Sequence, residues 1–125
     1  MARSDLDNRR SGIAVGVLVF LLLENQRFKG SKVPKWFNTM SQLQVIDMGY
    51  NQIRELPSFS KLVNLHTVDF QSNNLSEFPF EWYDLPSLNR IFLFDNPWKL
   101  TSKEYDRMLK MKDLMKLKGG ELFVN

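Results

Sequence analysis

Apolar and polar residues follow the same pattern in three stretches of the middle of the chain. Each stretch has the form apolar-x-x-apolar-x-apolar-x-x-Asn, and the three begin at Leu43, Leu65 and Leu88, so the period is nearly constant. Alternation over a few residues is typical of a short strand with one buried face. One such unit cannot bury its apolar side alone, so the repeat predicts strands that stack side by side.

The residues after each strand predict how the chain returns to begin the next one. Asn51, Asn73 and Asn96 stand where the three strands end, and their side chains can satisfy backbone groups of the turn. A Leu-Pro pair at 56–57 and a Phe-Pro pair at 78–79 follow, and proline favours an extended or irregular path. We therefore expect parallel strands on one side and irregular connections on the other.

The pattern over residues 43–98 resembles the consensus of the leucine-rich-repeat family, L-x-x-L-x-L-x-x-N-x-L. The resemblance implies an α/β fold: a short solenoid of three to four repeats with a parallel concave sheet, an irregular convex side and a cysteine-free C-terminal cap. It also implies protein binding without catalysis. A degenerate further copy is expected over residues 20–42, with the run 20–23 as its strand. Its register stays open: a count from Phe20 has Phe28 at the Asn position, and a count from Asn25 leaves one extra residue before Val33.

Residues 99–125 predict a cap helix and a tail. Thr101 and Glu104 have the spacing of a capping box, and the Gly-Gly pair at 119–120 predicts the end of the helix. We expect the helix to close the apolar end of the last repeat; the alternative is a basic amphipathic helix that docks on an acidic membrane or groove. Its predicted apolar face comprises Tyr105, Met108, Met111 and Met115, widened by Leu109 and Leu114.

The N-terminal region leaves several interpretations open. Residues 1–19 combine a basic leader with the start of an apolar run that extends over residues 12–23. Such a run is shorter than the roughly 17 to 25 residues of a membrane span. The run fits a buried strand that covers the first open end of the solenoid, and it also fits a signal peptide, a signal anchor or a truncated span.

Composition and charge exclude several classes of function. The chain has no cysteine and a single histidine, His66, which excludes thiolate zinc sites, thiol nucleophiles and His-rich metal sites. The net charge of +3 divides into +4 over residues 1–42, −4 over 43–98 and +3 over 99–125. Because the repeats are acidic, the basic pI of about 9.3 does not indicate nucleic-acid binding.

The repeat places one set of side chains on the exposed face of the expected sheet. Asp47 and Asp69 occupy the same repeat position, with Glu24 as a candidate to extend their column, and exposed aromatics beside charges are typical of interaction surfaces. Two carboxylates can do acid–base work, but no nucleophile or phosphate loop accompanies them, so we expect no enzyme activity. The alternative for the two phenylalanines is cover by the cap helix. The candidate partner-binding residues are Asp47, Tyr50, Asp69, Gln71, Arg90, Phe92 and Phe94.

Together these features predict a non-catalytic protein–protein recognition module. The expected partner is another protein with a basic surface; no cofactor, metal or nucleic acid is expected, and the cysteine-free chain favours the cytoplasm. The alternative function is a membrane-anchored or exported receptor-like fragment, in which residues 12–23 are the signal or anchor. Neither the oligomeric state nor the identity of the partner follows from the sequence.

Overall fold

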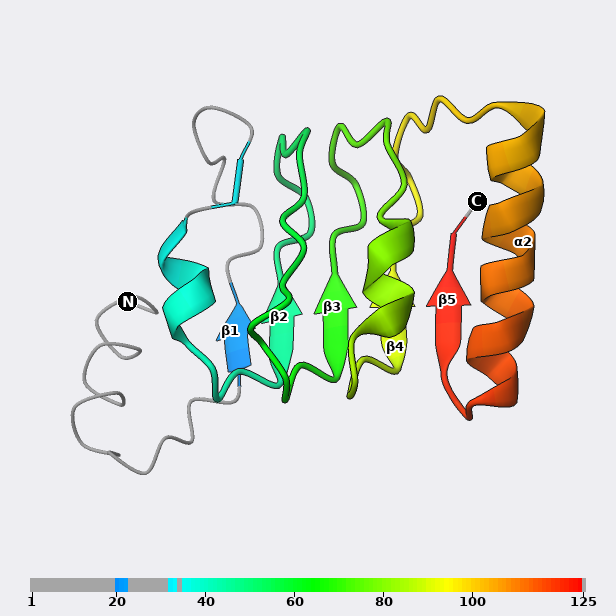
Figure 1. Ribbon diagram of the computed structural model, residues 1–125. Coiled ribbons are helices and arrows are strands. Elements are labelled where there is room, and N and C mark those ends of the chain that lie inside the picture. Colours follow the sequence, from blue (N-terminus) through cyan, green and yellow to red (C-terminus); the bar gives the residue numbers. More distant parts are fainter. Residues whose placement is uncertain (1–19, 23–31, 34, 125) are drawn as a thin grey trace, which may run out of the picture.

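The computed structural model describes residues 20–22, 32–33 and 35–124 of the chain, and within them five short strands form a single parallel sheet (Figure 1). The order of strands in space is their order in the sequence, so each repeat adds its strand beside the previous one. This arrangement confirms the predicted α/β solenoid with a parallel sheet. The strands are β1 (Phe20–Leu22), β2 (Val45–Asp47), β3 (Thr67–Asp69), β4 (Arg90–Phe92) and β5 (Glu121–Phe123).

The apolar positions of the repeat form a continuous core behind the sheet. The central residues of the last four strands, Ile46, Val68, Ile91 and Leu122, are each at most 2% exposed. The residues that flank them point to the opposite side and are at least partly exposed. That opposite side is the concave face of the solenoid, and the period-two alternation of the sequence is the reason that polar and aromatic side chains gather there.

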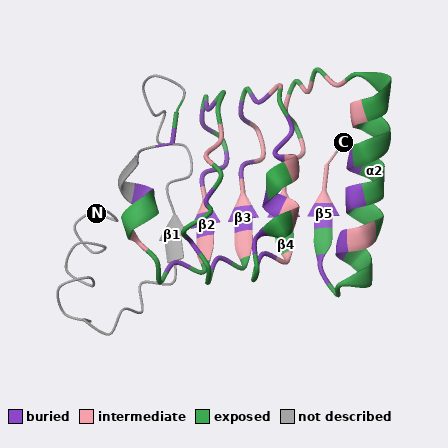
Figure 2. Cartoon of the chain, in the orientation of Figure 1, coloured by how far each residue is buried: buried purple, intermediate pink, exposed green. Residues whose placement is uncertain are grey.

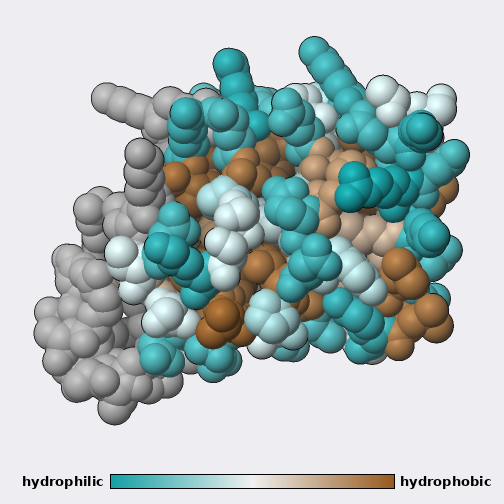
Figure 3. Space-filling view, in the orientation of Figure 1, coloured by the Kyte–Doolittle hydropathy of each residue, from teal (hydrophilic) through white to brown (hydrophobic). Residues whose placement is uncertain are grey.

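The returning segments cover the core on the convex side. Where the structure describes them, they contain two short 3-10 helices, η2 (Lys35–Thr39) and η3 (Phe80–Asp84), and otherwise follow irregular paths (Figure 1). Trp82 of η3 is completely buried; its ring packs on Phe59 and Phe70, with centroids 5.4 and 5.8 Å away, and its Nε1–H donates to the carbonyl oxygen of Pro57. In the space-filling view of Figure 3, apolar surface shows between hydrophilic side chains in the middle of the molecule.

The three repeat asparagines form a ladder at the ends of the strands, as their position in the sequence predicts. The Nδ2 group of Asn73 donates to the carbonyl oxygens of Met48, Phe70 and Gln71, and its Oδ1 accepts from the N–H of Ile53. Asn96 repeats the arrangement one unit later, with its Oδ1 accepting from the N–H groups of Asn73 and Leu75. The side-chain amides of Asn73 and Asn96 therefore each join two consecutive repeats through backbone groups that would otherwise be buried without partners, whereas Asn51 donates to Met48 and Gly49 of its own repeat.

The cap helix α2 (Ser102–Leu117) begins with the predicted capping box. The Thr101 hydroxyl accepts from the N–H of Glu104 at 3.1 Å, and the Glu104 carboxylate accepts from the N–H of Thr101 at 3.0 Å. The buried face of α2 is narrower than the sequence suggests. Met108, Met111 and Met115 are buried, whereas Tyr105 and Leu109 are 50% and 40% exposed, because only one edge of α2 reaches the core (Figure 2).

The segment after α2 is a strand, although the sequence pattern suggests only a tail. Residues 121–123 form β5, which pairs in parallel with β4 and continues the sheet by one more strand. Gly119 has a φ of +84°, which fits its predicted role in ending the helix. Gly120 has another role, since a Cβ atom there would lie 2.2 Å from the carbonyl oxygen of Asn89.

At the other edge of the sheet, β1 pairs with β2 and takes the strand position predicted for the degenerate copy. The register sets Leu21 opposite Ile46 and Phe20 opposite Val45, which is the third residue of its repeat. Phe20 is therefore the third residue of the degenerate copy, and the count that takes Phe20 as the first residue is wrong by two positions. The basic leader, residues 12–19 and 23 of the apolar run, and Phe28 lie outside the described residues. Among the residues that the structure does describe, no helix has the length and apolar character needed to cross a membrane.

Candidate functional site

The concave face carries the candidate residues in columns that run across the strands. The register pairs Val45 with Thr67 and Thr67 with Arg90 in one column. In the next column it pairs Asp47 with Asp69 and Asp69 with Phe92. These neighbours agree with the repeat alignment, because the parallel strands keep equivalent positions side by side. On β1 the residue opposite Asp47 is Leu22, and Glu24, the candidate to extend the second column, lies outside the described residues.

Asp47 and Asp69 form an acidic pair whose oxygens are held by the loop that follows each strand. Asp47 Oδ1 accepts from the N–H of Gly49 at 3.0 Å, and Asp69 Oδ1 accepts from the N–H of Gln71 at 3.0 Å. Asp69 Oδ2 also accepts from Gln71 Nε2 at 2.7 Å. Both carboxylates are thus fixed in direction by their own loops, on a face that partner side chains can reach.

Tyr50 lies beside this pair and is connected to it through Gln71. The Tyr50 hydroxyl donates to Gln71 Oε1 at 3.4 Å, and Gln71 in turn donates to Asp69. The Tyr50 backbone has a φ of +57°, and the equivalent residues Ser72 and Asp95 have φ values of +56° and +61°. A left-handed conformation is costly for a large side chain. The sequence therefore keeps a half-exposed tyrosine at a turn position that suits asparagine or glycine better.

An aromatic platform stands at the other end of the face, and one of its members was not predicted from the sequence. The rings of Phe92 and Phe123 stack with centroids 4.6 Å apart and planes 7° apart, and Phe94 meets Phe92 edge-on at 6.4 Å. The Arg90 guanidinium lies 5.5 Å from the Phe92 centroid and 5.8 Å from that of Phe123. The ring that packs on Phe92 thus comes from β5, whereas α2 sends its buried methionines into the core.

Phe123 was not predicted from the sequence, because its spacing from the preceding strand differs from the period of the repeat. Arg90 of β4 pairs with Glu121 of β5. These two residues are farther apart in the sequence than Thr67 and Arg90, which pair between β3 and β4, because α2 is inserted between the last two strands. The available signal was the apolar triplet Leu-Phe-Val at 122–124 after the double glycine. The seven candidates predicted from the sequence therefore divide into an acidic group around Asp69 and an aromatic group around Phe92, which Phe123 completes.

Burial affects the ionisation of Asp69. Desolvation raises the pKa of its carboxyl above the ordinary value, the hydrogen bonds from Gln71 lower it, and the nearby charge of Asp47 raises it. The folded state thus binds this proton more tightly than the unfolded chain does. The stability that Asp69 contributes is complete below the unfolded pKa and is lost as the pH rises through the raised pKa of the folded state.

We expect Asp69→Asn to raise the free energy of unfolding at neutral pH, because it removes a charge that burial disfavours. Solvent screening on this open face limits the gain to about 0.5 kcal/mol. The difference from the wild type should shrink as the solution is acidified below the raised pKa. Urea denaturation across this pH range measures it, and Asp84→Asn on η3 is the charge-matched control. An equal pH dependence in both variants would contradict the assignment.

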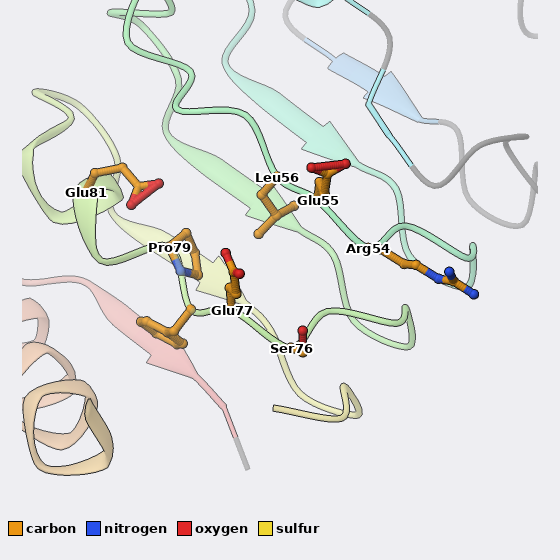
Figure 4. A pocket seen from close by; sticks show the side chains of 8 residues that line it. Arg54, Glu55, Leu56, Ser76, Glu77, Pro79 and Glu81 are labelled. Carbon is orange, nitrogen blue, oxygen red and sulfur yellow. The ribbon is translucent and has the colours of Figure 1, made fainter. Parts of the chain in front are cut away.

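Two open grooves lie beside the returning segments. The first, shown in Figure 4, has a volume of about 400 Å³ and is lined mainly by polar residues, among them Arg54, Glu55, Glu77 and Glu81. The second, of about 640 Å³, follows the asparagine ladder. Glu55 is already paired with Lys32 at 3.4 Å. In the part of the chain that the structure describes, no group of three or more His, Cys, Asp or Glu residues is arranged to hold a metal ion.

Comparison with known proteins finds similarity in the repeats. Residues 41–81 match the family model described as Leucine Rich repeats (2 copies). The chain is 29% identical over 100 residues to the "Leucine-rich repeat and WD repeat-containing protein 1" of Xenopus tropicalis. That alignment covers 74% of the chain and 14% of the Xenopus protein, so the chain spans about a seventh of the length of this relative.

Proposed function

We propose that the chain, whose residues 41–81 match a model of leucine-rich repeats, is a non-catalytic module that recognises another protein through its concave face. Leucine-rich repeats generally mediate protein–protein interaction, and the family is typically non-catalytic. The proposal assigns that general role to one face and to the residues on it. An open sheet face does not enclose a substrate away from water, which supports recognition over chemistry.

The observation that carries the proposal is the gathering of partly exposed aromatic rings beside a charged pair. Tyr50 is 50% exposed, and Phe92 and Phe94 also keep part of their surface open to solvent. The core has no need of these rings, because its own aromatic residues lie on the opposite side of the sheet. Aromatic side chains that remain accessible next to charges are the residues that most often dominate binding energy at interfaces.

The charge of the repeats supports a partner with a basic surface. Residues 43–98 carry a net charge of −4, and two of the acids point onto the proposed binding face. Opposite charge on the partner would increase the rate of encounter and select among partners more than it would increase affinity. We therefore propose a protein partner whose docking surface carries lysine or arginine.

The experiment compares the partners captured by the wild type with those captured by the triple variant Asp47→Ala/Asp69→Ala/Phe92→Ala. Because the three changes remove the charged pair and one ring of the platform, we expect the yield of specific partners to fall by at least about tenfold. Quantitative mass spectrometry of the captured proteins measures the yield. Circular dichroism and thermal denaturation confirm that the variant is folded.

A matched control removes two acids and one apolar side chain elsewhere. Glu77, Glu81 and Val63 are all exposed and lie outside the columns of the concave face. The variant Glu77→Ala/Glu81→Ala/Val63→Ala should capture the same partners as the wild type. Equal capture by the wild type and the concave-face variant would refute the proposed binding surface.

A further inference from the structure

One column of the concave face changes its chemistry halfway across the sheet. The register places Asp47, Asp69, Phe92 and Phe123 side by side on β2, β3, β4 and β5. The first two positions are carboxylates, and the last two are stacked rings. The face is therefore divided into an acidic half and an aromatic half along a line perpendicular to the strands.

The acidic half has no cation of its own at this position. Among the described residues, no lysine or arginine forms an ion pair with Asp47 or Asp69, and the nearby charge of Asp47 disfavours the charged form of Asp69. Gly49 lies close against the two carboxylates, since a Cβ there would be 3.3 Å from Asp47 Oδ1, 3.3 Å from Gln71 Cγ and 3.6 Å from Asp69 Oδ1. A cation supplied from outside would relieve this repulsion.

The aromatic half is ordered before any partner arrives. Phe92 is held between the parallel ring of Phe123 and the edge of Phe94. The guanidinium of Arg90 lies against the two stacked rings. It is therefore engaged by the rings and does not neutralise the acidic half. Rigid rings lose little conformational entropy on binding, which makes them effective anchors for an apolar side chain.

The distance between the two halves determines which secondary structure of a partner segment fits the face. Neighbouring strands are about 4.8 Å apart, so the centres of the two halves are about 10 Å apart. In an α-helix, residues i and i+7 lie on one face about 10.5 Å apart. In an extended chain, residues on one face are about 6.6 or 13 Å apart, neither of which matches.

We infer that the concave face binds an amphipathic helix of the partner that crosses the strands, with a lysine or arginine over Asp47 and Asp69 and an apolar side chain at position i+7 on the Phe92–Phe123 platform. The inference rests on the proposed function and adds the chemistry and spacing of the partner. Charge complementarity defines one end of the helix and the apolar platform defines the other.

The test uses the full chain and a phage-displayed library of random peptides about 16 residues long, enough for a helix of about 24 Å. Selection on the wild type alone should enrich sequences with Lys or Arg at i and an apolar residue at i+7. Fluorescence anisotropy then measures the affinity of selected peptides. The Asp47→Asn/Asp69→Asn variant should bind these peptides with an affinity at least about tenfold lower than that of the wild type, and so should Phe123→Ala.

Glu77→Gln/Glu81→Gln is the matched control, because it removes two carboxylates beside the groove of Figure 4, and it should change the affinity less than about twofold. Enriched peptides without a basic residue, or with another spacing, would overturn the inference, as would failure to enrich any sequence. Peptides that depend on Phe92 and Phe123 but not on the acids would refute the inference alone. Peptides that depend on no concave-face residue would refute the proposed function as well.

Discussion

Asn73→Ala is expected to lower the free energy of unfolding by about 3 to 5 kcal/mol, because four hydrogen bonds end on this one side chain. Its amide donates to three backbone carbonyls and its oxygen accepts from the N–H of Ile53. Asn73 itself is only 6% exposed, so alanine leaves several of these backbone groups with neither a partner nor easy access to water. Urea denaturation followed by fluorescence or circular dichroism measures the loss.

Asn74→Ala is the control for the loss of an asparagine in the same turn. Asn74 is exposed, and its contact with the previous repeat is made by its backbone N–H, which donates to the carbonyl oxygen of Ile53. The substitution keeps that hydrogen bond, so a change within about 0.5 kcal/mol is expected. Similar losses in the two variants would mean that the amide of Asn73 does not hold consecutive repeats together.

The asparagine ladder also shows why so much of the fold could be predicted. The nearly constant spacing of equivalent positions sets the strands in register, and the apolar positions of each copy determine which face is buried. Asp47, Asp69 and Phe92 were accordingly predicted to be neighbours from the alignment of the repeats alone. A local pattern is sufficient where each unit contacts only the next one.

The regions that could not be predicted are those where the period fails. Helix α2 separates β5 from the last repeat, so the pairing of Phe123 with Phe92 depends on how α2 packs and not on a spacing. At the other edge, the register of β1 differs by two positions from a count that begins at Phe20, and the neighbour of Asp47 on β1 is Leu22. Side-chain hydrogen bonds such as that between Tyr50 and Gln71 likewise require the folded geometry.

The two glycines after α2 look equivalent in the sequence, but substitution should separate them. Gly120→Ala is expected to lower the free energy of unfolding by about 2 to 3 kcal/mol, because its Cβ would lie 2.2 Å from a backbone oxygen, that of Asn89, which cannot rotate away. Gly119→Ala meets no atom within 4 Å, and its φ of +84° limits the cost to about 1 kcal/mol of backbone strain. Urea denaturation of the two variants measures the difference.

The place where Gly120→Ala weakens the structure tests the proposed clash with Asn89 more directly than the size of the loss in stability. To remove the clash, Gly120→Ala must displace β5, which would weaken the bonds from the N–H of Glu121 to Asn89 and from the N–H of Leu93 to Phe123. Hydrogen exchange at these two amides should accelerate more than at Met48, whose N–H donates from the end of β2 to β3. Because β5 also carries Phe123, the same substitution should disturb the aromatic platform while leaving the Asp47–Asp69 pair in place. Uniform acceleration at all three amides would show instead that β5 and the repeats unfold as one unit.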